Sequence, residues 1–237
     1  FTGQMPSSIQ TDSTAYALFL QANQVGNQQT DGGAETAIEL FQRALDIDQT
    51  YVAAWVGLAR MYLNEAALGQ RPFAQGHQLA EAALRKALSL LPDDANAQCT
   101  MAGLRFDENR VADAVEHLHA GLAPDTPNES SLSVVGDILC CLGEEGRAIE
   151  VHEFVSRRDP VNPSVYGNLA SAYFLAARWQ EALDALDVVE SLSPNALGIN
   201  ALRAIIFVLR RDPGDRERAL ACVERESFDG FKLEAMV

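Results

Sequence analysis

The chain has 237 residues, of which 48% are hydrophobic and 22% are charged, so it can build a continuous core and is not disordered throughout. Its 33 acidic residues outnumber its 18 basic residues and give a formal net charge of −15. Such an acidic surface repels phosphate groups, which argues against direct contact with nucleic acid or with an anionic membrane. Prolines are few and runs of Ala, Leu, Glu, Gln and Arg dominate, a composition that favours helices over strands.

Residues 1–12 are expected to be a linker or lead-in. They start with Phe1 rather than Met, and they lack the basic segment and apolar run of a secretory signal. We therefore expect the chain to be part of a longer protein. The most apolar stretch, 201–209, is too short to cross a bilayer and is followed by Arg210 and Arg211, so no membrane insertion is predicted.

Residues 13–51 predict the first pair of helices. The apolar run 15–20 marks the first helix, and Ala37, Phe41 and Ala44 mark one face of the second helix. This pair is more degenerate than those that follow it, as is expected of the terminal unit in a stack of repeats.

The following residues repeat with a fixed period. Small alanines recur every 34 residues, at Ala80, Ala114, Ala148 and Ala182. A second set of positions, occupied by proline in three of four cases, is also spaced 34 residues apart: Pro92, Thr126, Pro160 and Pro194. Small residues let two helices approach closely, and proline cannot continue a helix, so each cycle predicts a helix pair followed by a turn.

The clearest cycle carries Trp55, Leu58, Ala59 and Tyr62, then Ala80, Leu84 and Pro92. This order and spacing resembles the tetratricopeptide repeat, whose signature is W-x2-L-G-x2-Y, then A-x3-F, then P. The resemblance implies an all-α, right-handed α-α superhelix, or solenoid, of about six helix pairs over residues 13–226. The expected units are 13–51, 52–94, 95–128, 129–162, 163–196 and 197–226, followed by 227–237 as a tail or the start of a capping helix.

One unit is longer than the others. The small residue of the first helix and the alanine of the second are 12 residues apart in the central units, as in Ala102 and Ala114. They are 21 residues apart in Ala59 and Ala80, which places a nine-residue insertion within 64–76. Lengthened helices and a protruding loop both fit this insertion.

The sequence has few residue patterns that are typical of catalytic or metal-binding sites. The chain has no H-E-x-x-H, G-x-S-x-G, G-x-G-x-x-G or P-loop spacing. His152 occupies the large-residue position of its repeat, which predicts a packing role. The four cysteines lack C-x-x-C spacing and are expected to act as small apolar residues. We therefore predict a protein that is not an enzyme, with no catalytic residue, metal site or cofactor.

Proteins of the tetratricopeptide type usually bind peptides in a concave groove lined by the first helix of each pair. The resemblance implies groove candidates at Val56, Arg60, Leu63, Asn64, Cys99, Phe106, Asp107, Asp137, Cys140, Ser171, Phe174, Leu175, Ile205 and Val208. Five of them form an apolar ladder: Leu63, Phe106, Cys140, Phe174 and Val208. This ladder fits a peptide or helix of a protein partner. It also fits the protein itself, through residues 228–237 or through a second copy in a homodimer.

Segments 15–22, 37–48 and 53–59 are together similar to the repeat regions at the C-terminal end of bacterial multidomain regulators. These regulators include winged-helix transcription regulators and class III nucleotide cyclases. The similarity implies a regulatory or sensory interaction module, located in the cytoplasm, or in the periplasm if its parent is a membrane-anchored regulator. The alternative is a free-standing scaffold or assembly factor for secretion or cell-envelope complexes.

Overall fold

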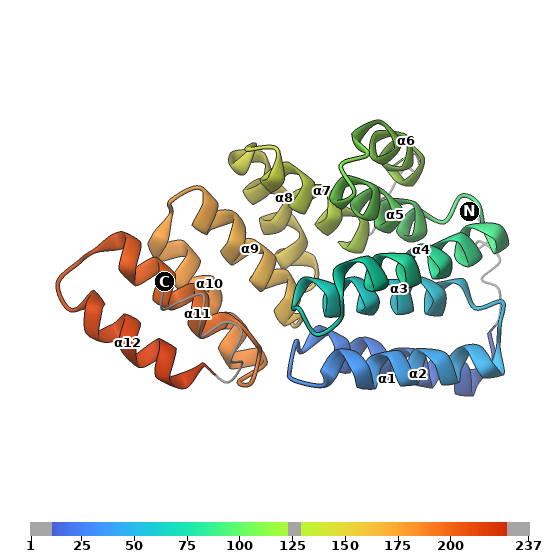
Figure 1. Ribbon diagram of the computed structural model, residues 1–237, viewed down its shortest axis with the longest axis horizontal. Coiled ribbons are helices and arrows are strands. Elements are labelled where there is room, and N and C mark those ends of the chain that lie inside the picture. Colours follow the sequence, from blue (N-terminus) through green and yellow to red (C-terminus); the bar gives the residue numbers. More distant parts are fainter. Residues whose placement is uncertain (1–10, 123–128, 227–237) are drawn as a thin grey trace, which may run out of the picture.

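The computed structural model describes residues 11–122 and 129–226, and these form helices joined by turns with no strand among them. The helices are α1 Ser13–Asn27, α2 Gly33–Ile47, α3 Val52–Ala67, α4 Phe73–Leu90, α5 Ala95–Asp107, α6 Val111–Leu122, α7 Glu129–Cys141, α8 Glu145–Arg158, α9 Pro163–Leu175, α10 Trp179–Leu192, α11 Ile199–Arg210 and α12 Asp215–Arg225. Each odd-numbered helix packs against the even-numbered helix that follows it, and the pairs stack along a curved array (Figure 1). The predicted all-α solenoid is confirmed for the described residues. The expected lead-in up to residue 10, Thr126 and the tail 227–237 lie outside them.

Polar side chains fix where several helices begin. The Asp12 carboxylate accepts a hydrogen bond from the Thr14 amide at 2.7 Å, and the Asp94 carboxylate accepts one from the Ala97 amide at 2.8 Å. At the start of α9, the Asn162 side chain caps the helix and Pro163 occupies its first turn. Each cap satisfies an amide that has no partner inside the helix, so the turns between units are specified locally.

Small residues set the distance between helices. A Cβ atom added at Gly57 in α3 would lie 2.4 Å from the ring of Phe41 in α2. A Cβ atom added at Gly136 in α7 would lie 2.5 Å from the ring of His152 in α8. The Phe41 and His152 side chains are fully buried at these contacts, which confirms the packing role predicted for His152.

We expect Gly136→Ala to lower the free energy of unfolding by about 1–3 kcal/mol, because the new methyl group overlaps the buried His152 ring. The matched control is Gly146→Ala in α8, where an added Cβ meets no atom within 4 Å. This control is expected to be neutral or to gain about 1 kcal/mol from the higher helix propensity of alanine. Urea unfolding followed by circular dichroism measures both variants, and equal stabilities would contradict the packing account.

An ion-pair cluster joins two neighbouring units where the repeat pattern is weak. Arg105 occupies the position of the signature tyrosine and is buried, with 5% of its surface exposed. Its guanidinium donates to the Glu81 carboxylate of α4 and, at 2.7 Å, to the Glu108 carboxylate. The hydrogen bond from Arg105 lowers the pKa of Glu81. A charge-assisted contact thus replaces the aromatic packing of the regular repeat.

The insertion lengthens two helices rather than forming a protruding loop. Helix α3 has 16 residues and α4 has 18, whereas the other described helices have between 11 and 15. The turn between them, 68–72, is closed by Arg71, whose guanidinium donates to the Glu65 carboxylate at 2.6 Å. The alternative of lengthened helices is therefore the correct one.

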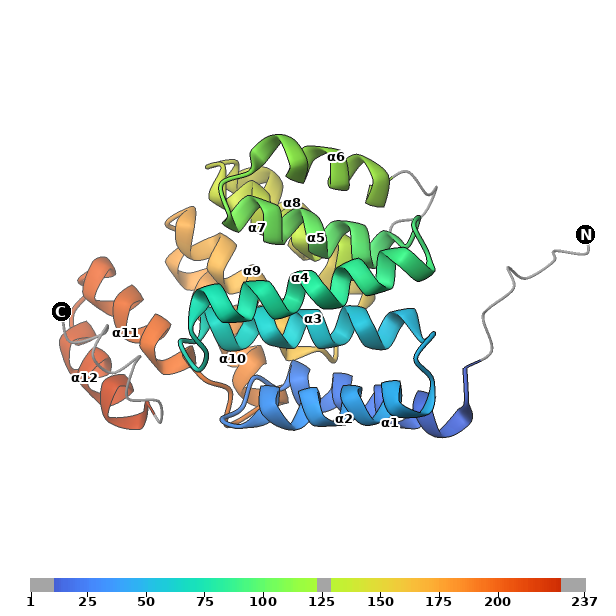
Figure 2. The ribbon, with the colours of Figure 1, turned by 45° about the vertical axis from the view of Figure 1, so that its right-hand side comes forward.

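The helix pairs follow one another along the array (Figure 2). The buried apolar residues divide into separate clusters along it. The first cluster extends from Ala15 in α1 to Leu104 in α5. The second extends from Ala148 in α8 to Ile206 in α11, and a small third cluster joins α11 to α12. Stacking neighbours therefore supplies the core, as the physics of repeat proteins requires. No helix in the described residues combines the length and apolarity needed to cross a membrane.

Candidate functional site

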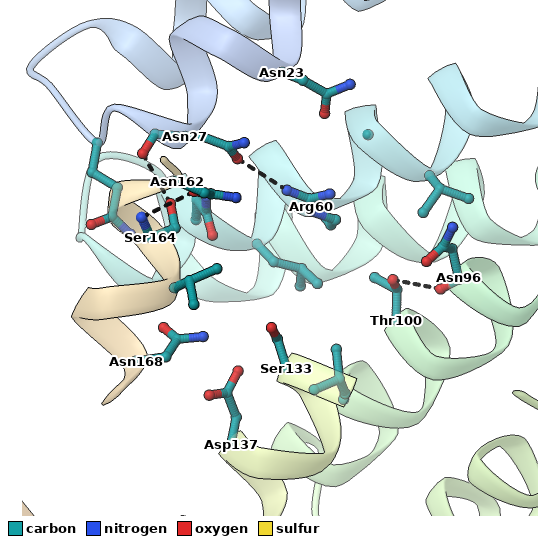
Figure 3. A pocket seen from close by; sticks show the side chains of 18 of the residues that line it. Asn23, Asn27, Arg60, Asn96, Thr100, Ser133, Asp137, Asn162, Ser164 and Asn168 are labelled. Carbon is teal, nitrogen blue, oxygen red and sulfur yellow. Dashed lines mark hydrogen bonds between the residues drawn. The ribbon is translucent and has the colours of Figure 1, made fainter. Parts of the chain in front are cut away.

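The first helices of successive pairs enclose a concave cavity. Its volume is about 540 Å³, within the range of ordinary ligand pockets. Side chains from α1, α3, α5, α7 and α9 line it, so it follows the inner surface of the array (Figure 3). The lining side chains belong to the helices that the resemblance assigned to the groove.

Contacts between distant turns close this cavity on one side. Three consecutive carbonyl oxygens, of Asn27, Gln28 and Gln29, accept hydrogen bonds from α9 and from the turn between α10 and α11. Their donors are the Ser164 hydroxyl at 2.9 Å, the Ser193 hydroxyl at 2.7 Å and the Leu197 amide at 2.9 Å. The turn between α1 and α2 therefore meets the start of α9 and the turn between α10 and α11 (Figures 1 and 2). We call this contact the seam.

Side-chain amides dominate the polar part of the lining. They belong to Asn23, Asn27, Gln29, Asn64, Asn96, Asn162 and Asn168. Asn64 and Asn168 make no side-chain hydrogen bond to other residues of 11–122 and 129–226, and the buried Asn96 Oδ1 atom has no partner there. An asparagine side chain offers two donors and one acceptor oxygen, the same groups that a peptide backbone needs. The lining can therefore pair with backbone N–H and C=O groups.

The cavity carries few charges. Among the described residues that line it, Arg60 is the one Lys or Arg side chain, and its guanidinium donates to the Asn27 side-chain oxygen at 3.4 Å. Burial lowers the pKa of the Arg60 guanidinium, although arginine remains protonated at neutral pH. The acidic lining residues are Asp107, Asp137 and Asp159. One basic group against three carboxylates makes the cavity a poor site for phosphate.

The pKa values of two carboxylates that line the cavity, Asp107 and Asp137, are raised. Burial raises the pKa of Asp137 to about 7, and the neighbouring Asp107 charge adds to this rise. Burial likewise raises the pKa of Asp107. The His152 Nε2 atom lies 3.4 Å from the Asp137 carboxylate, but burial lowers the pKa of His152 to about 4. At neutral pH this histidine is uncharged, so it does not compensate Asp137.

We expect Asp137→Asn to stabilise the protein above pH 7 and to change little near pH 4. The pKa of Asp137 in the folded state lies above the ordinary aspartate value of 3.8, so the folded state binds an extra proton between about pH 4 and pH 7. The free energy of unfolding therefore falls as the pH rises through this window. Because 53% of the Asp137 side chain is exposed, solvent screening reduces the expected gain to about 1–2 kcal/mol.

Urea unfolding of both proteins at several pH values measures this effect. His152 acts in the opposite direction, since its lowered pKa removes stability as the pH falls from about 6.5 to about 4. Comparing the variant with the unmodified protein at each pH cancels that contribution. A difference in stability that does not change with pH would show that Asp137 keeps an ordinary pKa.

Half of the predicted groove residues line the cavity. These are Val56, Arg60, Leu63, Asn64, Phe106, Asp107 and Asp137. The expectation for Cys99 is wrong, because Cys99 is fully buried and faces Gly121 of α6 inside its own helix pair. In chain order, the described lining residues begin at Phe19 in α1 and end at Asn168 in α9.

The other six candidates do not line the cavity. They are Cys140, Ser171, Phe174, Leu175, Ile205 and Val208. Phe174 packs on Trp179 with ring centroids 5.7 Å apart, and Cys140 packs against the second apolar cluster. Leu175 and Val208 remain about half exposed. The physical reason is the seam, which ends the enclosed surface at α9, so the apolar ladder is not continuous inside it.

Sequence reasoning missed most of the amides. Asn23, Asn27, Asn96 and Asn162 were not among the candidates, although they line the cavity. A signal was present for one of them, because asparagine is disfavoured inside helices and Asn23 nevertheless lies within α1. The seam left no such signal, since it is made by backbone carbonyls and by serines that occur in many turns.

Comparisons with known proteins support the fold. No protein-family model matches the sequence, and no curated protein matches it significantly. Among solved structures, the human IFIT1 dimer with m7Gppp-AAAA shares 14% identity over 81% of this chain and 46% of that chain, with a TM-score of 0.65. PilW, a type IV pilus biogenesis factor, shares 17% identity over 96% of this chain and 100% of that chain, with a TM-score of 0.57. The Cut9–Hcn1 tetramer of APC/C shares 17% identity over 94% of this chain and 46% of that chain, with a TM-score of 0.60.

These neighbours are tetratricopeptide-repeat proteins, and the chain has the fold of that family. The chain spans less than half of the IFIT1 and Cut9 chains and the whole of PilW. At identities of 14% to 17%, the likeness extends to the fold and not to a ligand.

Proposed function

We propose that this protein is a non-catalytic interaction module that binds an extended polypeptide segment of a partner in its concave cavity. The observation that carries the proposal is the row of side-chain amides along the lining, on α1, α3, α5 and α9. The proposal assigns no catalytic step, metal or cofactor to the chain. It places no nucleic acid in the cavity, because Arg60 is the one basic side chain of the described lining.

An extended segment fits these amides better than a helix does. In a helix, the backbone N–H and C=O groups are already paired within the segment and cannot reach the amides of a groove. In an extended segment these groups are unpaired and must find partners when they leave water. Asn64, Asn96 and Asn168 lie on three different helices that line the cavity and can supply such partners at separate points along the segment. Figure 3 shows Asn96 and Asn168 on different helices.

The apolar lining residues supply the remaining contacts. Phe19 and Phe106 line the cavity from α1 and α5, and both are half-buried. Side chains of a bound segment that point toward them bury apolar surface, which gives affinity without specifying a charge. This arrangement predicts that backbone contacts hold the segment and that its sequence preference is for apolar side chains.

Selection from a library of short random peptides tests this proposal. A selected peptide is then prepared in two forms, one flexible and one stapled into a helix, and their affinities are measured by fluorescence anisotropy. The flexible form is expected to bind and the stapled form to lose at least tenfold in affinity. Tighter binding by the stapled form would show that the occupant is a helix.

For the biological setting we propose the regulatory or sensory part of a bacterial signalling or transcription regulator, based on the similarity of its opening segments. The second candidate, a scaffold for secretion or cell-envelope complexes, is favoured by the match to PilW, which extends over nearly the full length of both chains. The sequence encoded upstream of Phe1 separates them. A winged-helix or cyclase domain supports the first setting, whereas a signal peptide supports the second.

A further inference from the structure

The seam holds the two ends of the cavity together with few contacts. Its three hydrogen bonds join residues that are far apart in the chain, from Asn27, Gln28 and Gln29 to Ser164, Ser193 and Leu197. The Gln29 backbone has a positive φ of 53°, and the corresponding turn residues Asn109, Ala177 and Arg211 of other units have a positive φ too, so this conformation belongs to the repeat. What is particular to this turn is that its Gln29 carbonyl accepts a hydrogen bond from the Leu197 amide.

No described apolar cluster crosses the seam. The first cluster ends in α5 and the second begins in α8, so α1 and α9 belong to different cores. A second cavity of about 360 Å³ lies at the contact, between Gln24 and Gln28 on one side and Val161 and Leu192 on the other. The seam consequently rests on hydrogen bonds between uncharged groups, which water can replace when the two sides separate.

When the seam is closed, the lining of the cavity is continuous from α9 back to α1. Asn27 and Gln29 line it from one side, and Ser164 and Asn168 line it from the other, so the inner surface is a ring while the seam is shut. A segment inside this ring cannot leave sideways. It either slides out along its own length or waits until the seam opens.

From these observations, we infer that the turn 27–29 is a latch whose opening controls how fast a polypeptide segment enters and leaves the cavity. The inference rests on the proposed function for its cargo, but the opening of the latch is a property of the protein alone. Low-stability contacts of this kind open locally while the core stays folded. The partner that this device suits is a segment flanked by folded domains, which has no free end to thread.

Amide hydrogen exchange at Leu197 measures the opening directly, because this amide donates to the Gln29 carbonyl across the seam. The variant is Ser164→Ala with Ser193→Ala, which removes the other two donors. Exchange at Leu197 is expected to become at least tenfold faster, while exchange at Val189 in the core of α10 stays unchanged. Unaltered exchange at Leu197 would overturn the latch.

The matched control is Ser171→Ala with Ser191→Ala. Ser171 lies on α9, as Ser164 does, and Ser191 lies in the last turn of α10, just before Ser193 at the C-cap, but the hydroxyls of Ser171 and Ser191 donate to the Gly167 and Val188 carbonyls within their own helices. The control is expected to leave exchange at Leu197 within twofold of the unmodified protein. A similar acceleration in both double variants would show a general loosening of the helices instead of an opening seam.

The unmodified protein supplies an independent test should the double variant fail to fold. In low concentrations of urea, exchange at Leu197 is expected to be almost insensitive to urea, because local opening exposes little surface. Exchange at Val189 is expected to depend steeply on urea, because it requires unfolding of the core. Equal urea dependence at the two amides would mean that the seam opens only when the array unfolds.

Stopped-flow binding of a fluorescent peptide selected as above tests control of the rates. Because the latch stays mostly closed, more frequent opening is expected to accelerate association and dissociation by similar factors, with an almost unchanged Kd. Faster dissociation alone, with a weaker Kd, would make the serines binding contacts and not a latch. Failure to find any peptide would count against the proposed function, whereas the exchange result at Leu197 would stand on its own.

Discussion

Replacing Phe41 with alanine is expected to lower the free energy of unfolding by about 3–5 kcal/mol. The Phe41 side chain is fully buried between α1 and α3, with its ring against Gly57 and 6.0 Å from the Phe19 ring. Gly57 provides the space that this ring fills, so alanine leaves a cavity that α3 cannot collapse into without moving its backbone. Since each unit contacts mainly its neighbours, the loss is expected to be greatest in α1–α3.

Urea unfolding followed by circular dichroism, combined with hydrogen exchange, measures both the size and the location of this loss. The matched control is Phe73→Ala in α4, whose ring is 56% exposed and is expected to cost about 1 kcal/mol or less. A loss below about 1 kcal/mol for Phe41→Ala would contradict the account of how the first units pack.

Filling the cavity is expected to abolish peptide binding. Gly103 lies on α5 in the cavity lining, and a Cβ atom added there meets only the Val134 side chain, at an ordinary distance of 3.5 Å. Gly103→Phe therefore places a large ring in the cavity without a clash at its base. We expect a loss of at least 100-fold in the affinity for a selected peptide, because the ring occupies the space of the bound segment.

The control for this change is Gly146→Phe on α8, where an added Cβ has no neighbour within 4 Å. Both variants replace a helical glycine with phenylalanine, so their effects on helix propensity are the same. Fluorescence anisotropy is expected to show affinity within twofold of the unmodified protein for Gly146→Phe. Retained binding by Gly103→Phe would place the peptide elsewhere on the protein.

The repeat could be predicted from the sequence because it depends on local rules. Alanines every 34 residues face the partner helix of the same pair, as at Ala80 and Ala182, and both are completely buried. In three units a proline follows the C-cap of the second helix directly, at Pro92, Pro160 and Pro194. The same contact between the two helices of a pair recurs in each unit, so the residues that make it recur at a fixed spacing in the sequence.

The groove could be predicted only in part, because its extent depends on how small rotations between units accumulate. Arg60, Phe106 and Asp137 were identified since they occupy equivalent faces of the first helices. Phe174 and Val208 occupy equivalent faces too, but the seam closes the array before them. Where the array closes depends on the curvature of all its units together, and no single residue records it.

The central claim is that the cavity holds a polypeptide by its backbone, and a backbone N-methylation scan of a selected peptide tests it most directly. Methylating a backbone nitrogen removes one donor for the asparagine side chains, and each such loss is expected to weaken binding by about tenfold at the peptide bonds inside the cavity. Methylation at the ends of the peptide is expected to have little effect. An affinity that is unaffected by N-methylation at every position, yet is lost when single side chains are replaced by alanine, would contradict the account.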